Sequence, residues 1–235
     1  MPKDCPKPRL QKSLGYPNLQ STTSTKVRRT NTYIELRKEV TIMANYNKSL
    51  SPTAVRLGEV RFSYAYLFSP RANDDGTEKY STQILIPKSD TMAKKLIDDA
   101  VEVAKKNGVS TKWNGKMPVA SKLKLPLRDG DEEYPGDPLY EGHWFMNAST
   151  SVEHKPGVAI LENGQVVQAL DGDDFYSGCY GCVTLNFFPY AAKGSNGVAA
   201  GLNNVIKTRD GEKLAGGHSA EQDFADLLSD ASFLD

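Results

Sequence analysis

The fold is decided by the stretch Val55–Phe68, which reads VRLGEVRFSYAYLF. In its second half, every other residue is aromatic or β-branched, namely Val60, Phe62, Tyr64, Tyr66 and Phe68. A period of two is typical of a β-strand, because successive side chains of a strand point to opposite faces. We therefore expect a long strand that carries these residues on one face and ends at Pro70.

More strands are predicted on either side of polar turns. The turn sequence Asn73-Asp74-Asp75-Gly76 separates the first strand from Lys79–Pro87, so these two strands are expected to form a hairpin. Several segments in the second half of the chain also have the β-branched and aromatic residues that are typical of strands. The further strands are expected over His143–Glu153, Val158–Leu161, Val166–Leu170, Gly178–Tyr190 and Val198–Lys207.

A single helix is predicted, over residues 91–107, where apolar residues recur at helical spacing. Ser89 or Asp90 would cap its N-terminus, and Gly108 is expected just after its C-terminus. Residues 109–142 are expected to be rich in loops. Many strands with one helix indicate an all-β barrel or sandwich and exclude a βαβ protein.

Charge is spread unevenly along a chain whose net charge is zero. Residues 1–42 hold nine Lys or Arg against three acids, residues 43–215 hold 20 against 21, and residues 216–235 hold five acids alone. Because the body is not broadly basic, any nucleic-acid site must be a local patch. No apolar run approaches the roughly 18 residues of a membrane span and no signal peptide is present, so we expect a cytoplasmic protein without membrane contact.

The two ends of the chain have the composition of disordered segments. Residues 1–42 are rich in Pro, Ser, Thr, Lys and Arg and lack periodicity. Lys38-Glu39-Val40 can be encoded by a ribosome-binding sequence, so we expect natural translation to start at Met43; a basic arm that contacts nucleic acid is the alternative. Residues 216–235 are too charged to bury their own Phe and Leu side chains. They suit a peptide that other proteins bind, a polyanion that competes for a basic groove, or a frayed solubilising end.

Enzymatic chemistry finds little support in the sequence. The three cysteines, Cys5, Cys179 and Cys182, fit a reducing cytoplasm, and a zinc site would need a second ligand pair. Acids cluster at 129–133 and 171–174 and could hold magnesium in a nuclease, although acids beside glycine more often form turns. We therefore expect no enzyme, no cofactor and no metal, with a magnesium-dependent nuclease or junction-processing enzyme as the alternative.

Aromatic and basic residues interleave on the predicted strands. Single-stranded DNA needs this mixture, because exposed rings stack on bases, worth about 1–3 kcal/mol per base, while cations neutralise phosphates. The sequence has no recognition helix of the kind that reads duplex DNA. Any one ring could instead belong to the core, and tyrosines are the better candidates because a buried hydroxyl needs a partner. The candidates are Arg61, Tyr64, Tyr66, Arg71, Lys79, Tyr80, Lys112, Trp113, Tyr176, Tyr180, Phe188, Tyr190, Lys193, Lys207 and Arg209.

Four segments carry a family resemblance. They are PRANDDGTEKYSTQILIPK (70–88), PLRDGDEE (126–133), FYSGCYG (175–181) and GVAAGLNNVIKTRDGEKLAGG (197–217). Followed by an acidic tail, they resemble a phage- and prophage-encoded family of single-stranded DNA-binding proteins, long catalogued as a domain of unknown function. The resemblance runs from Val55 to Leu228 and adds nothing for residues 1–42.

The resemblance implies an OB-fold that binds single-stranded DNA with little sequence preference. It also implies a tail that recruits a DNA polymerase and a helicase, as in the replication proteins of certain lytic phages. The position after FYSGCYG, usually basic in the family, is Cys182 here, which implies one phosphate contact fewer. The partner-binding residues of the tail are expected to be Asp223, Phe224, Asp226, Asp230, Phe233 and Asp235.

We therefore expect an OB-fold-like five-stranded barrel with insertions over residues 43–215, between a disordered leader and an acidic tail. The expected function is to coat single-stranded DNA during phage DNA replication or recombination in the bacterial host. A phage structural protein is a further alternative to the nuclease. The oligomeric state is left open, with a homodimer among the allowed states.

Overall fold

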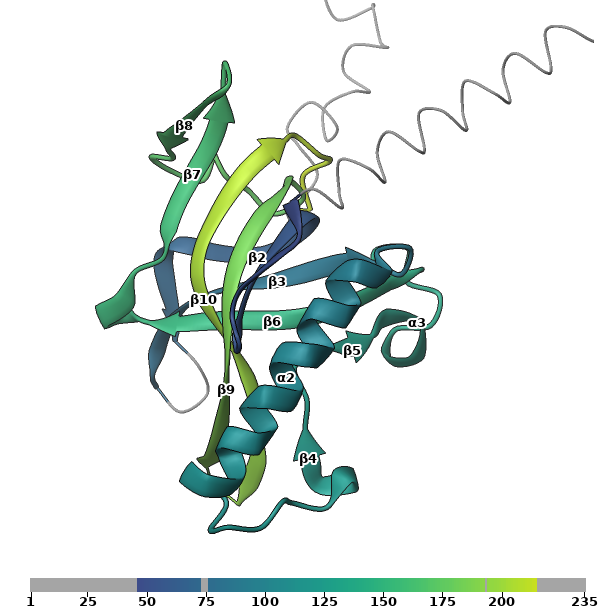
Figure 1. The fold of residues 1–235 in the computed structure, drawn as a ribbon. Helices are drawn as coiled ribbons and strands as arrows, with labels where there is room; N and C mark the ends of the chain where they lie inside the picture. Colours follow the sequence, from purple (N-terminus) through teal and green to yellow (C-terminus); the bar gives the residue numbers. More distant parts are fainter. Residues whose placement is uncertain (1–45, 73–75, 193, 215–235) are drawn as a thin grey trace, which may run out of the picture. The chain divides into compact units, whose positions relative to one another are not determined.

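The computed structural model describes residues 46–72, 76–192 and 194–214 (Figure 1). The expectations for the leader, for a start at Met43, for Lys193 and for the tail over 216–235 lie outside the described residues. In chain order the elements are β1 (Lys48–Ser51), β2 (Ala54–Ala72), β3 (Glu78–Pro87), α2 (Thr91–Thr111), η1 (Ala120–Lys122), β4 (Leu123–Lys124), β5 (Arg128–Asp129), α3 (Gly130–Glu133), β6 (His143–Ser151), η2 (Val152–His154), β7 (Gly157–Glu162), β8 (Gln165–Gln168), β9 (Tyr180–Ala192) and β10 (Ser195–Arg209).

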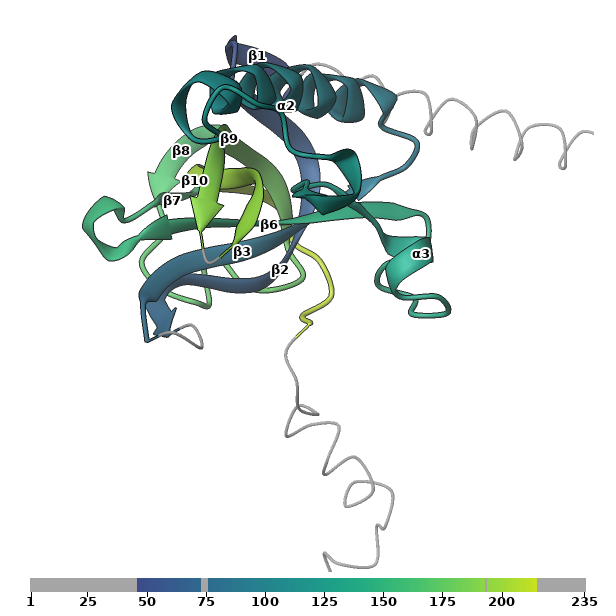
Figure 2. The same cartoon turned by 90° about the horizontal axis from the view of Figure 1, so that it is seen from below.

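Five strands close into a barrel in the order β2–β3–β6–β10–β9 and back to β2 (Figure 2). Neighbours are antiparallel except β6 and β10, which run parallel where Ala148 lies beside Ala200. That parallel contact closes the sheet on itself. A small five-stranded barrel of this kind is the OB-fold, so the predicted fold class is confirmed.

Strand β2 does not keep one face inward along its length. Its fully buried side chains are Val55, Leu57, Val60, Phe62 and Leu67. The inward side therefore passes from odd to even positions at Glu59 and back to odd positions at Tyr64. Both residues have positive φ, 47° and 48°, and the pairing with β9 or β3 shifts register around them. These are β-bulges, which insert one residue and turn the following side chains over.

The bulges make the predicted single face of β2 wrong. Phe62 is fully buried, whereas Tyr64, two residues later, is 56% exposed. The predicted end at Pro70 is also wrong, since β2 continues to Ala72. Pro70 lies where the β2–β3 pairing is irregular, between Tyr66 and Arg71, so the N–H that proline lacks is not required by the ladder there.

Helix α2 begins as predicted and ends later. The Asp90 carboxylate accepts a hydrogen bond from the Ala93 N–H, which confirms Asp90 as the cap. The helix continues past Gly108 to Thr111, so the expected end at residue 107 is wrong. A Cβ added at Gly108 would lie 2.7 Å from the ring of Trp113, so glycine serves close packing here and not helix termination. The described residues also include the four-residue helix α3, beyond the single helix expected.

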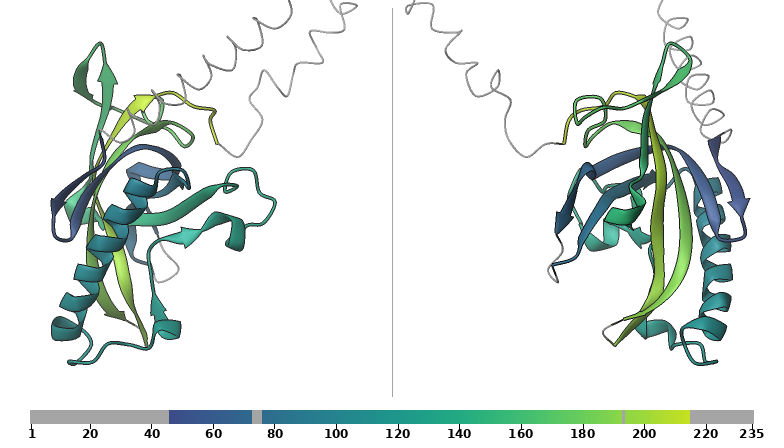
Figure 3. Two further views of the ribbon diagram at one scale, coloured as in Figure 1. Left: turned by 45° about the vertical axis from the view of Figure 1, so that its right-hand side comes forward. Right: turned by 90° about the vertical axis from the view of Figure 1, so that its left-hand side faces the viewer.

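The barrel interior and one side of α2 share a hydrophobic core. Helix α2 packs against β9, β2 and β10, and Figure 3 shows it lying along the barrel wall. Phe62 and Phe175 meet inside the barrel with ring centroids 4.9 Å apart. The largest fully buried side chains are Phe62, Phe145, Phe175, Phe187, Leu57, Leu67, Ile84, Leu85, Ile86, Ile97, Met146 and Leu185.

A β-hairpin, β7–β8, is inserted between β6 and β9 and lies along β10. Its turn at Asn163-Gly164 has positive φ at both residues, 50° and 78°, as a tight hairpin turn requires. The short strands predicted on either side of this turn are confirmed. In Figure 1 the hairpin extends past the end of the barrel. Within the described residues, no helix has the length and apolar character to cross a membrane.

Candidate nucleic-acid interface

A groove of about 620 Å³ lies over strands β2, β3 and β6. We call it the tyrosine groove and define it by Tyr64, Tyr66, Arg71, Lys79, Tyr134 and Tyr140, which all line it. The first four were predicted as DNA contacts from sequence, and the structure brings them together. A groove lined by rings and cations is the arrangement that unpaired bases and their phosphates require.

The bulge in β2 presents Tyr64 to the groove. The backbone at Tyr64 is left-handed, and the next N–H, that of Ala65, donates to the Ser177 Oγ at 3.0 Å. A non-glycine residue in this conformation is held there by its surroundings and often marks a functional site. The consequence is a large ring that is 56% exposed in the middle of a barrel strand.

Two cations lie at the end of the groove beyond Tyr66. The Arg71 Cζ lies 5.1 Å from the centroid of the Tyr66 ring. The Arg71 Nη1 also donates a hydrogen bond to the Tyr66 hydroxyl at 3.0 Å. Lys79 pairs with Arg71 across the β2–β3 ladder. The ring and the two positive charges are therefore positioned by the same pair of strands, suited to stack on one base and neutralise the adjoining phosphates.

The opposite wall of the groove was missed by the sequence reasoning. Tyr134 stacks on Tyr140 with centroids 4.3 Å apart and rings inclined by 24°. The Tyr140 hydroxyl donates to the Gln83 Oε1 at 2.8 Å, and burial raises the pKa of Tyr140. Tyr134 is 40% exposed and offers a second ring face to the groove. Its signal in the sequence is its position directly after PLRDGDEE, one of the segments that carry the family resemblance.

A second group of rings and cations forms where β2, β9 and β10 meet. The Tyr180 ring has the Arg209 Cζ at 3.8 Å and the Arg61 Cζ at 5.5 Å from its centroid. Both arginines face Tyr180 in the strand register, Arg61 on β2 and Arg209 on β10. We call these three residues, with Tyr176 and Lys207, the Tyr180 cluster.

Tyr176 completes the Tyr180 cluster next to the end of β10. The Lys207 and Lys213 ammonium groups each lie 5.2 Å from its ring centroid. Its hydroxyl donates to the Asp210 Oδ1 at 2.9 Å, and burial raises the pKa of Tyr176. The neighbouring Ser177 lines a small hollow together with Tyr64, Tyr66 and Leu214. The cluster and the tyrosine groove therefore adjoin each other.

Comparison with known proteins places the chain in a family. The model for the Enterobacter phage Enc34 ssDNA-binding protein matches residues 53–234, most of the chain. The chain belongs to the Enc34 single-stranded DNA-binding protein family. The predicted resemblance is confirmed, and the match of this Enc34-family chain extends over the positions of its acidic tail.

Relatives of this Enc34-family chain are known in sequence and in structure. Protein p50 of Acyrthosiphon pisum secondary endosymbiont phage 1 is 34% identical over 183 residues, which cover 74% of the chain and 93% of that protein. The Enc34 protein solved with ssDNA is 27% identical with a TM-score of 0.60, over 72% of this chain and 96% of that one. Its C-terminal truncation is 26% identical with a TM-score of 0.59, over 73% and 99%. The family and these structures are of DNA-binding proteins and not of enzymes, as expected for this chain.

Other predicted contacts of the Enc34-family chain lie elsewhere. Trp113 is only 6% exposed and its indole N–H donates to the Tyr190 carbonyl at 3.0 Å, so its prediction as a stacking ring is wrong. The reason is the glycine in α2, which lets the ring pack into the core. Lys112, Tyr190 and Phe188 lie with it toward the far end of β9, where α2 ends (Figure 1). The structure does not bring these residues to the tyrosine groove.

Three sets of predicted contacts remain to be placed. Tyr80 is half-buried and alternates along β3 with Lys79 and Ser81, which line the groove, so it belongs to the other face of the strand. Lys193 lies outside the described residues, as do the tail candidates within 216–235. These assignments stay predictions.

The acid clusters serve local structure. The Asp171 Oδ1 accepts the N–H groups of Asp173 and Asp174, as in a turn. The Lys88 ammonium bonds the carboxylates of Asp129 and Asp131 and thereby lowers the pKa of each. Over the described part of the chain, no three His, Cys, Asp or Glu side chains are grouped as metal ligands. The acids predicted as magnesium ligands are thus engaged in a turn and in an ion-pair cluster.

The two cysteines of the Cys-Tyr-Gly-Cys sequence are buried free thiols. Burial raises the pKa of Cys179 to about 11 and raises that of Cys182 as well. Such thiols are inert, because the thiolate is the reactive form. The motif therefore reflects β9 packing and not redox chemistry.

Iodoacetamide at pH 8 is expected to label Cys179 about a hundredfold more slowly in the folded protein than in urea, because its thiolate is strongly disfavoured. Peptide mass spectrometry over a time course measures the two rates at each cysteine. Equal rates in both conditions would contradict the burial of this thiol.

Proposed function

We propose that this Enc34-family chain binds single-stranded DNA along the tyrosine groove and the adjoining Tyr180 cluster. The observation that carries the proposal is the bulge that exposes Tyr64 in the same groove as the cation-flanked ring of Tyr66. The rings would stack on bases and the arginines and lysines would neutralise phosphates. The related Enc34 structure with bound ssDNA supports the same ligand.

Weak sequence preference follows from this chemistry. Every base has a π-face that can stack on a tyrosine, whereas sequence readout needs hydrogen bonds to base edges. The lining of the groove includes four tyrosine rings and two long cations. The chain would therefore coat unpaired DNA of any sequence, reversibly, during phage replication or recombination in the host cytoplasm.

The acidic tail is proposed to recruit replication proteins, a DNA polymerase and a helicase among them. Its support is the family match through residue 234 and its composition of acids with interspersed Phe and Leu. Short acidic–apolar peptides bind basic, apolar grooves of partner proteins. Pull-down of a replicative polymerase by the full chain, but not by one lacking residues 216–235, would test this role.

The DNA-binding proposal is tested by fluorescence anisotropy with dT oligonucleotides of increasing length and with a duplex of equal length. We expect tight binding of the single strand, weak binding of the duplex, and weaker binding of both at higher salt. A labelled strand incubated with protein and magnesium should stay intact, and its cleavage would favour the nuclease alternative. Equal affinity for the two forms would favour a structural protein.

Substituting Lys79→Gln is expected to lower the slope of log affinity against log salt by about 0.7, the value for one phosphate contact to a single strand. Lys79 lines the tyrosine groove beside Arg71, so its charge would lie along the proposed path of the DNA backbone. The matched control is Lys95→Gln on α2, whose ammonium is paired with Asp99 away from the groove. An unchanged slope for Lys79→Gln would remove this residue from the DNA path.

A further inference from the structure

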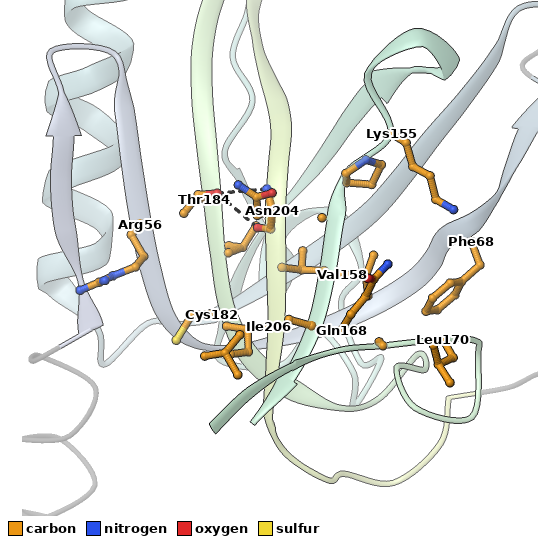
Figure 4. Close-up of a pocket in the computed structure, with 17 residues that line it drawn as sticks. Arg56, Phe68, Lys155, Val158, Gln168, Leu170, Cys182, Thr184, Asn204 and Ile206 are labelled. Atoms are coloured by element: carbon orange, nitrogen blue, oxygen red, sulfur yellow. Dashed lines mark hydrogen bonds between the residues drawn. The ribbon is translucent and has the colours of Figure 1, made fainter. Parts of the chain in front are cut away.

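A second cavity, of about 670 Å³, lies between the β7–β8 hairpin and strands β9 and β10 (Figure 4). We call it the hairpin pocket. It shares no lining residue with the tyrosine groove or with the hollow beside Tyr64. Its apolar lining includes Phe68, Val158, Val166, Leu170 and Ile206.

The hairpin pocket is open to solvent although much of its lining is apolar. Val166 is 70% exposed and Leu170 is 80% exposed, although both line it. Apolar side chains left in water around an open pocket mark a binding site. The charged residues of its lining are Arg56 and Lys155, both positive. A ligand for this pocket is therefore apolar with negative charges beside its apolar groups.

We propose that the hairpin pocket binds the C-terminal tail of its own chain, residues 216–235. The tail has the required chemistry, because Phe224, Leu227 and Phe233 stand among five acids without any Lys or Arg. Apolar side chains would fill the pocket while neighbouring carboxylates approach Arg56 and Lys155.

The path of the chain favours the tail of the same chain. The Leu214 N–H, at the end of the described residues, donates to the Ser177 carbonyl at 2.8 Å, and the Lys213 Nζ lies 3.7 Å from the Asp173 Oδ1. The turn that holds Asp173 also supports the pocket wall, since the Leu170 N–H donates to the Asp174 carboxylate at 2.8 Å.

The described chain therefore ends beside the segment 171–177, which supports the hairpin pocket at Asp174 and borders the hollow of Tyr64 at Ser177. From Leu214 to Phe224 an extended chain spans up to about 33 Å, ample to reach a pocket beside its own exit. Apolar side chains of the tail that are bound in the hairpin pocket lie outside the tyrosine groove. The chain can therefore bind DNA in the groove while its tail stays in the pocket. A partner protein that binds the same Phe and Leu residues must first displace them from the pocket.

The test places a photocrosslinking residue, p-benzoylphenylalanine, at Phe224 or Phe233 of the full chain. Irradiation followed by peptide mass spectrometry is expected to give crosslinks within one chain to residues 155–170 or 204–206, with and without a dT oligonucleotide. Crosslinks to the tyrosine groove, crosslinks only between chains, or no crosslinks would each overturn the proposal.

Pocket variants sharpen the test. Val166→Asp and Leu170→Asp are each expected to lower the crosslink yield by about tenfold, because a carboxylate in the pocket repels the acidic tail and disfavours apolar contact. Both sites are exposed, so the fold should persist. The matched control is Val167→Asp, an exposed valine on the other face of β8 that is not part of the pocket lining. Equal yields in pocket and control variants would overturn the proposal.

The experiment separates this inference from the proposed function. Anisotropy with a dT oligonucleotide is measured on the same variants, and their affinity should match that of the parent chain, since the pocket lies outside the groove. A chain that fails to bind DNA but keeps the expected crosslinks would refute the function alone. A chain that binds DNA without those crosslinks would refute the pocket alone.

Discussion

Replacing Tyr64 and Tyr66 together by alanine is expected to lower the affinity for a dT oligonucleotide by about 30-fold or more. Each ring stacked on a base contributes about 1–3 kcal/mol, and the two rings line the same groove. Tyr64 is the more exposed of the two, and its removal leaves the barrel core untouched. Anisotropy titration at fixed salt measures the change, with thermal unfolding followed in parallel to show that the variant is folded.

The matched control is Phe188→Ala. Phe188 is 43% exposed on β9 and was also a predicted DNA contact, but it lies outside the tyrosine groove. We expect its loss to leave the affinity within about twofold of the parent chain, an effect below 0.5 kcal/mol in size. If Phe188→Ala cost as much as the tyrosine pair, the DNA path would have to run along β9 instead.

Phe62→Ala is expected to lower the free energy of unfolding by about 3–5 kcal/mol. The Phe62 side chain is fully buried, and its ring packs on Phe175 at a centroid distance of 4.9 Å. Its backbone also ties β2 to the start of β9, since its carbonyl accepts the Gly178 N–H at 2.7 Å. Urea denaturation measures the loss as a shift of the midpoint with an unchanged slope.

Phe188→Ala again serves as the control, because the same substitution is made at an exposed site. Its free energy of unfolding should change by about 0.5 kcal/mol or less. A small effect of Phe62→Ala, comparable to that of Phe188→Ala, would contradict the placement of Phe62 at the centre of the barrel.

Local patterns predicted the elements of this fold well. The β2–β3 hairpin, the Asp90 cap and the short strands β7 and β8 were all expected from neighbouring residues. Each depends on interactions within a few residues, such as a carboxylate that accepts an N–H three positions later. The family resemblance was likewise visible in ungapped segments and was confirmed over residues 53–234.

Packing between distant segments overruled the local patterns elsewhere. Gly108 suggested a helix end, yet it lies inside α2 because Trp113 and Pro189 pack closely against it. The same contact buries the tryptophan that had been predicted to stack on DNA. The sequence around Gly108 and Trp113 reads the same whether the tryptophan ring packs on the helix or extends into water. The local pattern therefore could not predict the burial of this ring.

The sequence by itself determined the strands, the long helix, the family and the chemical kind of the candidate site, because these follow from side-chain periodicity and residue type along a short stretch of chain. Tertiary structure alone decided which rings face the groove. The bulges at Glu59 and Tyr64 lie on either side of Arg61, the residue at which β2 passes from pairing with β9 to pairing with β3. A glycine, Gly58, lies beside the first bulge, whereas no glycine adjoins Tyr64. Arg61, Tyr180 and Arg209 meet only because the β9–β10 hairpin pairs with β2, a strand from the other end of the described chain.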